Sequence, residues 1–363
     1  MCTEAKREGL LFTHRRIPLK PLEPLHQGAV HFLTCTYVVV NHFVNVLYLA
    51  GVLVILLLAV QRGEAAELTP INFVSSGSAG IVEVIKFSQK QGFFKKQGLD
   101  MTMIYVPSGV LAAQTVVSGS ALIANNSVSD ILNAIAAGAP LKILTVNIDR
   151  FQHLFVARPG IHSPKDMKGK KVAVSRYGAF SDIETRFLIR QWGMDPERDI
   201  QVLQIGNSAA RSAALMSGGV DGAVVTPAFV PVARNAGLNV IFDLSTIKTR
   251  FANIGLMAQE KLIREQPRLV KAAVAGLVHG IKFWKSNPDA AKAYLKQIHK
   301  VSAADLDSIY EDGSKNVRSE PTPDLDGIQT AWESIPELKA RGPVDFRKFI
   351  EPRFIEEVLR EMK

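Results

Sequence analysis

Polar side chains that could hold a small molecule occur in four short turns, each directly after a run of apolar residues. These side chains are Ser75, Ser76 and Ser78 in the first turn, Asn125, Asn126 and Ser127 in the second, Arg176, Tyr177 and Ser181 in the third, and Thr226 in the fourth. Hydroxyl and amide groups both donate and accept hydrogen bonds, and a guanidinium group binds anions through charged hydrogen bonds. Together these residue types are typical of a binding site for a polar or anionic molecule.

The third turn carries the most information. The spacing Ser181-Asp182-Ile183-Glu184 matches the capping box S-x-x-E, which predicts that Ser181 begins a helix. Arg176 and Tyr177 precede it and could supply a cation and a hydroxyl group to a ligand. Ser, Asn and Gly are ordinary turn residues, so a purely structural role stays open for each turn taken alone. The presence of four such turns favours a binding site.

Phe151 comes shortly after the apolar run 141–148. It could stack on a ligand or pack in the core or in a hinge, and both interpretations stay open. Ser129 and Asp130 are expected to begin the helix after the Asn-Asn-Ser turn.

The sequence has no arrangement typical of catalysis or metal binding. His153, His162, His279 and His299 form no i,i+4 pair and no H-E-x-x-H motif, and neither G-x-S-x-G nor G-x-x-x-x-G-K-[ST] occurs. Both cysteines precede residue 67, which removes thiolate chemistry and disulfides from the rest of the chain. We therefore expect no enzyme activity, no cofactor and no metal site.

From Pro70 onward, strand-like and helix-like runs alternate, which predicts an α/β fold with two parallel-type sheets and flanking helices. The expected strands cover 71–76, 99–106, 121–126, 141–148, 170–175, 200–206, 222–226 and 239–244. Ligands of such sheets gather beyond the carboxyl ends of the strands, where helices begin. Each of the four polar turns occupies such a position.

The same order of elements occurs twice, which predicts two lobes. After Ser245 the pattern changes to helices, and this tail is expected to pack back on the first lobe. The prediction is a discontinuous first lobe (67–156 and 257–363) and a second lobe (157–256). The chain would then cross between the lobes near 156–160 and near 251–257, which makes a hinge with two crossovers.

Residues 1–66 are excluded from this fold. The run 46–60 has no charged residue and is shorter than the roughly 20 apolar residues that span a bilayer. Basic residues precede it and Gly63-Glu64-Ala65-Ala66 follows it, which predicts a secretory signal peptide cleaved near Ala65 or Ala66. The alternative is an uncleaved membrane anchor formed by 44–60.

The formal net charge of +9 is spread along the chain. Basic residues do not cluster with stacking aromatic residues, so we expect no nucleic-acid partner. Most of the charges are interpreted as a solvated surface, although a basic protein could also take an anionic ligand.

Several stretches resemble the substrate-binding proteins of ABC importers, in the branch that handles nitrate, sulfonates, taurine and thiamine-pyrimidine precursors. They are residues 71–106, residues 165–181, the segment GVDGAVVTPAF (219–229) and residues 267–291. The resemblance implies a two-lobed type II periplasmic binding protein fold that closes on its ligand. It places the cleft loops at the four polar turns, and it implies a monomer. A related eukaryotic branch that makes the thiamine pyrimidine depends on a cysteine-rich motif, and the absence of cysteine after Cys35 argues against that activity.

The expected function is that of a periplasmic solute-binding protein. It would capture a small anionic or heterocyclic organic molecule and deliver it to the permease of an ABC importer. The alternative is a membrane-anchored protein of the same fold that senses a ligand and has no transport role.

Overall fold

The computed structural model describes residues 41–52, 67–76, 80–106, 108–299 and 302–363. The chain divides into two units, Met1–Ala66 and Glu67–Lys363. In the first unit, residues 41–52 form a helix with exposed apolar side chains such as Phe43 and Tyr48. None of the helices in the described ranges combines the length and the apolar character that a bilayer crossing requires. The rest of the predicted signal segment, and Ser78, lie outside the described residues.

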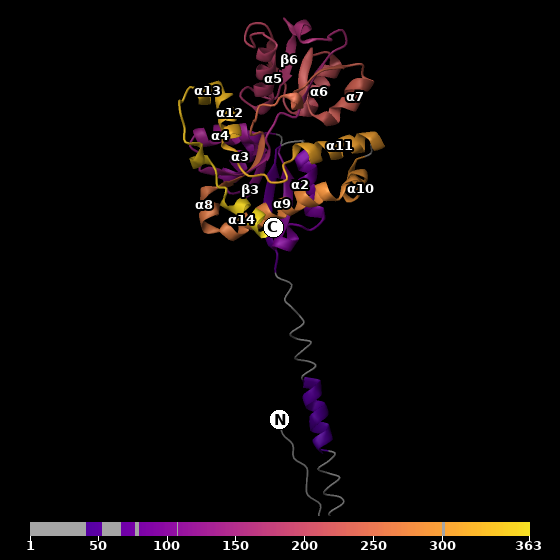
Figure 1. The fold of residues 1–363 in the computed structure, drawn as a ribbon, viewed down its shortest axis with the longest axis vertical. Helices are drawn as coiled ribbons and strands as arrows, with labels where there is room; N and C mark the ends of the chain where they lie inside the picture. The colour runs from indigo at the N-terminus through magenta and orange to yellow at the C-terminus, as the bar shows by residue number, and fades with distance from the viewer. Residues whose placement is uncertain (1–40, 53–66, 77–79, 107, 300–301) are drawn as a thin grey trace, which may run out of the picture. The chain divides into compact units, whose positions relative to one another are not determined.

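The second unit contains two five-stranded sheets (Figure 1). The first sheet has the order β2-β1-β3-β10-β4. Its strands are β1 (Thr69–Ser75), β2 (Leu99–Tyr105), β3 (Ile123–Ser127), β4 (Leu141–Ile148) and β10 (Ile254–Gln259). Strand β1 runs parallel to β2 and β3, and β10 runs antiparallel to β3 and β4. We call this sheet with its helices the first lobe.

The second sheet repeats this arrangement, with the order β7-β6-β8-β5-β9. Its strands are β5 (Leu154–Ala157), β6 (Lys171–Val174), β7 (Gln201–Gln204), β8 (Gly222–Val225) and β9 (Asn239–Asp243). Here β5 is the antiparallel strand, between β8 and β9. We call this sheet with α5 (Phe180–Gln191), α6 (Ser208–Ser217), α7 (Val230–Asn235) and η2 to η4 the second lobe.

The sheets are therefore mixed, whereas the sequence pattern predicted parallel-type sheets. The pattern missed β5 and β10, the two antiparallel strands. Both lie inside their sheets, are almost entirely buried, and pair antiparallel with both of their neighbours. Gly255 in β10 is required by close packing, because a Cβ atom there would lie 2.1 Å from the carbonyl oxygen of Thr145.

The first lobe is covered by helices from both ends of its sequence. On one face, α2 (Gly80–Lys90) packs against α9 (Pro267–Ser286), and the other face carries α3 (Gly109–Val117) and α4 (Val128–Ala136). Two glycines allow α9 to approach closely: a Cβ atom on Gly280 would lie 1.7 Å from Ser88 Oγ, and one on Gly276 would lie 2.6 Å from the Phe94 ring. This tight contact anchors the tail on the first lobe.

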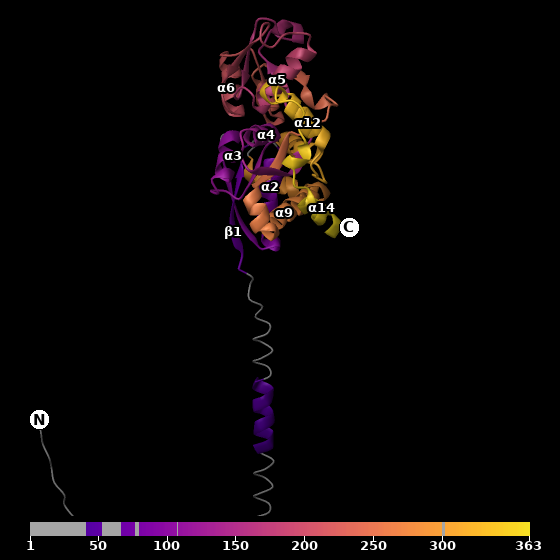
Figure 2. The ribbon, with the colours of Figure 1, turned by 90° about the vertical axis from the view of Figure 1, so that its left-hand side faces the viewer.

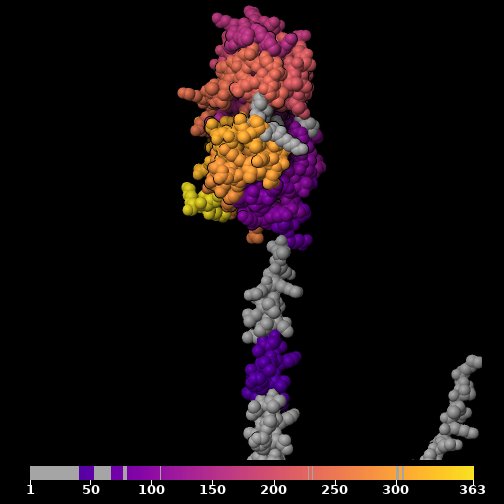
Figure 3. All heavy atoms as spheres, turned by 90° about the vertical axis from the view of Figure 1, so that its right-hand side faces the viewer, coloured from indigo at the N-terminus to yellow at the C-terminus, as the bar shows by residue number. Residues whose placement is uncertain are grey.

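The rest of the tail continues around the first lobe. Helix α12 packs beside α4 (Figure 2), whereas α11 contacts both α2 and the η3 turn of the second lobe. Figure 3 shows the orange surface of the tail beside the indigo and violet surface of the first lobe. The remaining elements are α8 (Glu260–Glu265), α10 (Pro288–Ile298), α11 (Ala303–Asn316), α12 (Leu325–Glu333), α13 (Pro336–Lys339), α14 (Arg353–Glu361), η1 (Lys95–Gln97), η2 (Pro164–Met167), η3 (Pro227–Phe229), η4 (Leu244–Thr246) and η5 (Phe346–Phe349).

Two segments connect the lobes: residues 149–153 between β4 and β5, and residues 247–253 between η4 and β10. They lie side by side, since the Phe251 amide donates to the Asp149 carbonyl at 3.0 Å and the Asn253 amide donates to the Ile148 carbonyl at 2.9 Å. We call them the first and second crossing segments. Both begin several residues earlier than the crossings expected from sequence, because the unpredicted strands β5 and β10 occupy part of the expected ranges.

Candidate functional site

A cavity of about 250 Å³ lies between the lobes. Its walls come from the carboxyl ends of strands in both sheets and from the first crossing segment. The lining residues are Ser76, Tyr105, Ser108, Gly109, Ser127 and Asp130 from the first lobe, His153 from the crossing segment, and Ser175, Arg176, Ala179, Phe180, Ser181, Gly206, Asn207, Ser208, Arg211 and Thr226 from the second lobe. The cavity thus joins polar turns that are far apart in the sequence.

Four helices begin at this cavity: α3, α4, α5 and α6. Two of them have side-chain caps, because Ser108 Oγ accepts from the Leu111 amide at 3.2 Å and Asn207 Oδ1 accepts from the Ala210 amide at 3.0 Å. Helix N-termini carry partial positive charge and unpaired amide groups. The cavity therefore has a field that favours negative or electron-rich groups.

The predicted residues of the first lobe divide into a lining set and a supporting set. Ser76 and Ser127 line the cavity, whereas Ser75, Asn125 and Asn126 lie buried beneath it. Asn126 Oδ1 accepts from Ser76 Oγ at 2.5 Å, and Asn125 Nδ2 donates to Ser75 Oγ at 3.3 Å. The buried amides thus hold the turns in place.

Ser181 lines the cavity, but it does not begin its helix as the capping-box pattern predicted. Helix α5 starts at Phe180 with Ala179 as its N-cap, so Ser181 already lies in the first turn. Its Oγ accepts from the Ser175 amide at 2.8 Å. Glu184 does not reach back to the cap either, because its carboxylate contacts His153. The S-x-x-E pattern is therefore a chance match here.

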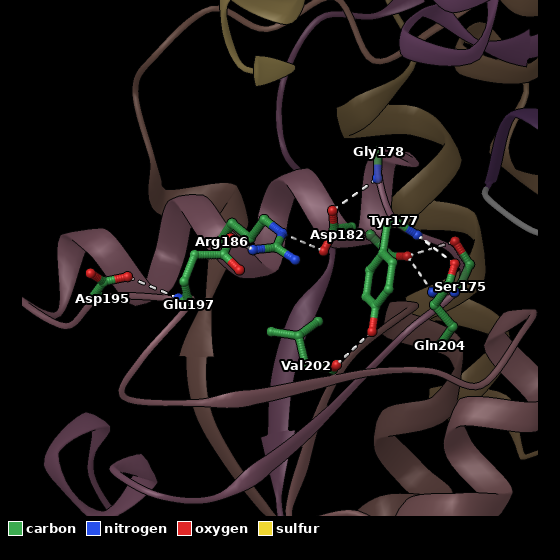
Figure 4. Close-up of polar contacts among 10 residues, drawn as sticks. Ser175, Tyr177, Gly178, Asp182, Arg186, Asp195, Glu197, Val202 and Gln204 are labelled. Carbon is green, nitrogen blue, oxygen red and sulfur yellow. Dashed lines mark hydrogen bonds and ion pairs between the residues drawn. The ribbon is translucent and has the colours of Figure 1, made fainter. Parts of the chain in front are cut away.

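Tyr177 does not line the cavity. Figure 4 shows its side chain directed toward Val202. Its hydroxyl donates to the Val202 carbonyl at 3.0 Å, and its amide donates to Gln204 Oε1 at 2.9 Å. In the same loop, Asp182 accepts from the Gly178 amide at 2.9 Å. Tyr177 thus attaches the loop to β7. Arg176 and Thr226, which the sequence analysis also predicted as ligand-binding residues, line the cavity.

Phe151 is fully buried between the crossing segments and α5. Its ring centroid lies 4.8 Å from that of Phe251, on the second crossing segment, and 5.2 Å from that of Phe187. It also stacks at 6.1 Å on Phe180, which lines the cavity. Of the two roles that the sequence left open, the position of Phe151 matches packing at the hinge.

Asp130 is a cavity residue that sequence reasoning assigned only to a helix start. It lies in the first turn of α4 and is 8% exposed. Burial raises its pKa to about 6, although the positive charge of Arg176 acts in the opposite direction. The carboxylate oxygen lies 3.6 Å from an Arg176 Nη atom of the other lobe. Its place directly after the Asn-Asn-Ser turn was the signal that could have identified it.

The sequence analysis also missed three polar residues at or beside the cavity: His153, Glu184 and Arg211. His153 Nδ1 lies 2.5 Å from Glu184 Oε2, and Glu184 is fully buried. Arg211 is 4% exposed and donates to the carbonyls of Gly206 and Val224 at 2.9 and 3.2 Å. Burial lowers its pKa to about 10, with the Glu184 charge opposing that shift, so Arg211 stays cationic at neutral pH.

The family model that matches this chain is described as NMT1/THI5 like, and it covers residues 84–291. The chain belongs to the NMT1/THI5-like family. This match confirms the family resemblance inferred from the sequence.

Individual relatives are distant. A Brucella abortus protein whose name assigns it a presumed binding role is 25% identical over 264 residues, covering 69% of this chain and 78% of that protein. The riboflavin-binding protein RibY of Chloroflexus aurantiacus is 28% identical over 208 residues, covering 55% and 58%. The aliphatic sulphonate binding protein SsuA of Escherichia coli superposes with a TM-score of 0.62 at 19% identity, covering 79% and 92%.

A Candida albicans protein described as having the generic periplasmic binding protein fold superposes with a TM-score of 0.61 at 19% identity, covering 81% of this chain and 95% of that one. The predicted two-lobed periplasmic binding protein fold is thus confirmed.

In this member of the NMT1/THI5-like family, both cations at the cavity have an acid in their surroundings. Arg176 forms an ion pair with Asp130 across the lobes, and the negative charge of Glu184 acts on Arg211. Among the residues that the structure describes, no group of three or more His, Cys, Asp or Glu side chains is placed to hold a metal ion. The cavity lining contains two cations, one acid whose pKa is raised by burial, and several hydroxyl groups.

Proposed function

We propose that residues 67–363 capture a small organic molecule in the interlobe cavity and deliver it to the permease of an ABC importer. The observation that carries this proposal is the cavity itself, which both lobes line at the carboxyl ends of their strands. Family membership supports the proposal, as does the Staphylococcus aureus ligand binding component of an ABC-type import system, which superposes with a TM-score of 0.67 at 12% identity and covers 80% of this chain and 99% of that one.

The ligand in this proposal is anionic or heterocyclic. Arg176, Arg211 and four helix N-termini favour an anionic group, and the rings of Tyr105 and Phe180 offer apolar faces to a flat molecule. The names of relatives support both classes, since SsuA binds sulfonates and RibY binds riboflavin.

The two lobes of this proposal are close to the predicted 67–156 with 257–363 and 157–256, but all of β5 belongs to the second lobe and all of β10 to the first. They are hinged at the crossing segments around the Phe151 ring cluster. Closure on the ligand is a population shift in which the bound lobes gain contacts from both walls. The protein acts as an exported monomer that binds and does not catalyse. Residues 1–66 direct its export, and the mass of the protein recovered from cells decides between cleavage near Ala66 and retention of 44–60 as an anchor.

The test is thermal unfolding of the purified full chain against sulfonates, nitrate, aromatic acids, pyrimidines, riboflavin and amines. A ligand at 100 times its dissociation constant adds about 2.7 kcal/mol to the free energy of unfolding, which raises the melting temperature by about 5 °C. We expect such a shift with one ligand class. A well-folded protein that responds to no compound in the panel would contradict the binding proposal.

A further inference from the structure

One ion pair spans the cavity from one lobe to the other. Asp130 Oδ1 on α4 lies 3.6 Å from an Arg176 Nη atom on the loop after β6, and both residues line the cavity. The two partners differ in environment, because the Arg176 side chain is 43% exposed and the Asp130 side chain 9%. The guanidinium can therefore be reached by a ligand, whereas the carboxylate is fixed in the wall.

The surroundings of Asp130 hold it in place. A Cβ atom on Gly109 would lie 1.9 Å from Asp130 Oδ2 and 2.6 Å from Asn126 Oδ1, so the carboxylate packs against the start of α3. Asn126 Nδ2 in turn donates to the Gly109 carbonyl at 2.9 Å. Since this packing leaves the carboxylate little room to turn away, Asp130 stays beside any group that binds Arg176.

Other titratable groups face the same cavity: Tyr105 from β2, His153 from the first crossing segment and Arg211 from α6. Glu184 is paired with His153, behind the cavity wall. Arg176 is the charged group that acts on the Asp130 carboxyl, and burial opposes ionisation of that carboxyl. A ligand anion at Arg176 would cancel the one favourable charge and add a repulsive one.

We propose that Asp130 controls which ligand charge the cavity accepts: the anionic group of the ligand replaces Asp130 at Arg176, and Asp130 then takes up a proton from solvent. One O–H bond forms on the Asp130 carboxyl, and the neutral carboxyl donates a hydrogen bond to the bound molecule. This inference rests on the proposed binding function and specifies how an anion is bound.

The sign of the pH dependence follows directly. With a pKa of about 6, Asp130 is largely ionised at pH 7 in the free protein, and the neighbouring anion raises that pKa in the complex. The complex then holds more protons than the free protein, so anion affinity rises as pH falls. The change is up to about tenfold per pH unit between pH 6 and the pKa in the complex.

The experiment is calorimetric titration of the full chain with ethanesulfonate, benzoate and orotate at pH 7, in buffers that differ in ionisation enthalpy. We expect uptake of between about 0.4 and 0.9 protons per anion bound, for a pKa that rises by one or more units on binding. Anion binding without proton uptake overturns the exchange and leaves the binding function standing. The exchange is also overturned if these anions fail while neutral riboflavin or cytosine binds. If none of these compounds gives a measurable heat of binding, the proposed binding function itself is contradicted.

A substitution separates the exchange from other roles of Asp130. Asp130→Asn resembles the protonated residue, so at pH 7 it should bind the anions about tenfold more tightly than the unchanged protein, at pH 5 about equally, and without proton uptake. Asp312→Asn is the matched control, because Asp312 is a half-buried carboxylate whose pKa is also raised by desolvation but which does not line the cavity. It should leave proton uptake unchanged. Weaker anion binding by Asp130→Asn would show instead that the ionised carboxylate holds the ligand.

Discussion

The two lobes have the same sheet topology but contribute differently to the cavity. The first lobe contains a large apolar core to which the helices of the tail contribute. In the second lobe, the sheet face that carries Leu215 and Val225 has a smaller core. At the cavity, both lobes present hydroxyl groups, but the buried acid Asp130 comes from the first lobe and the cations Arg176 and Arg211 come from the second.

This difference indicates a division of labour between the lobes. The walls of the first lobe are fixed by interior hydrogen bonds such as that from Asn147 Nδ2 to Asn125 Oδ1 at 3.2 Å. In the proposed function, charged recognition of an anion would fall to the second lobe, which would move about the crossing segments on closure. Stability and recognition should therefore respond to substitutions in different lobes.

The largest expected effect is loss of stability on substitution in the first-lobe core. Trp284 on α9 is fully buried and contacts the rings of Phe87 and Tyr310 at 5.2 and 5.7 Å. Trp284→Ala should lower the free energy of unfolding by about 3–5 kcal/mol, as measured by urea denaturation. Leu215→Ala in the second lobe is the comparison and should cost less, since its small core can relax. An equal or larger loss from Leu215→Ala would contradict the difference in support.

The next largest effect concerns the fixed cation of the second lobe. Arg211 is almost fully buried and held by two carbonyl groups, so it is already positioned for an anion. Arg211→Met keeps much of the side-chain volume and should weaken binding of an anionic ligand by about 2–5 kcal/mol in calorimetric titration. Arg198→Met, at an exposed ion pair with Asp195 outside the cavity, should leave the affinity unchanged. Unchanged anion affinity in Arg211→Met would place recognition elsewhere.

A smaller effect is expected at the exposed cation. The Arg176 side chain is partly in solvent, and its present partner Asp130 can become neutral when the guanidinium is removed. Removal of one hydrogen bond between charged groups costs up to about 3 kcal/mol, and neutralisation of Asp130 offsets part of that loss. Arg176→Gln should therefore weaken anion binding by only about 1–2 kcal/mol. The ratio of the anion affinities of Arg176→Gln and Arg211→Met compares the exposed cation with the buried one. A greater loss of affinity in Arg176→Gln than in Arg211→Met would contradict the expected order.

Much of the fold followed from the sequence because its signals are local. The predicted strand 71–76 corresponds to β1, and 141–148 coincides with β4, because apolar runs ended by turn residues mark half-buried and buried strands alike. Strands β5 and β10 could not be found this way. Their pairing depends on where the chain crosses between the lobes, which is a long-range property.

The site was predictable only as far as strand ends determine it. Ser76, Ser127, Arg176, Ser181 and Thr226 all line the cavity, since each lies at the carboxyl end of a strand or in the turn and helix start that follow it. What local sequence does not encode is the direction of a side chain within a turn. Asn125 and Asn126 turn inward to hydrogen-bond partners, and the role of an isolated residue such as Arg211 or His153 depends on the charge that the fold brings beside it.

The smallest expected effect concerns Tyr177, which belongs to the loop after β6 but does not line the cavity. Tyr177→Phe removes the hydrogen bond from the hydroxyl to the Val202 carbonyl and keeps the ring beside Arg186, so it should lower the free energy of unfolding by about 0.5–1 kcal/mol. Ligand affinity should not change, because the hydroxyl contacts β7 and not the cavity. Tyr105→Phe, on the first-lobe wall, is the matched variant whose hydroxyl can reach a ligand. If Tyr177→Phe weakened ligand binding while Tyr105→Phe did not, the loop after β6 would have to rearrange on closure so that the Tyr177 hydroxyl reaches the ligand. Recognition by the second lobe would then include Tyr177.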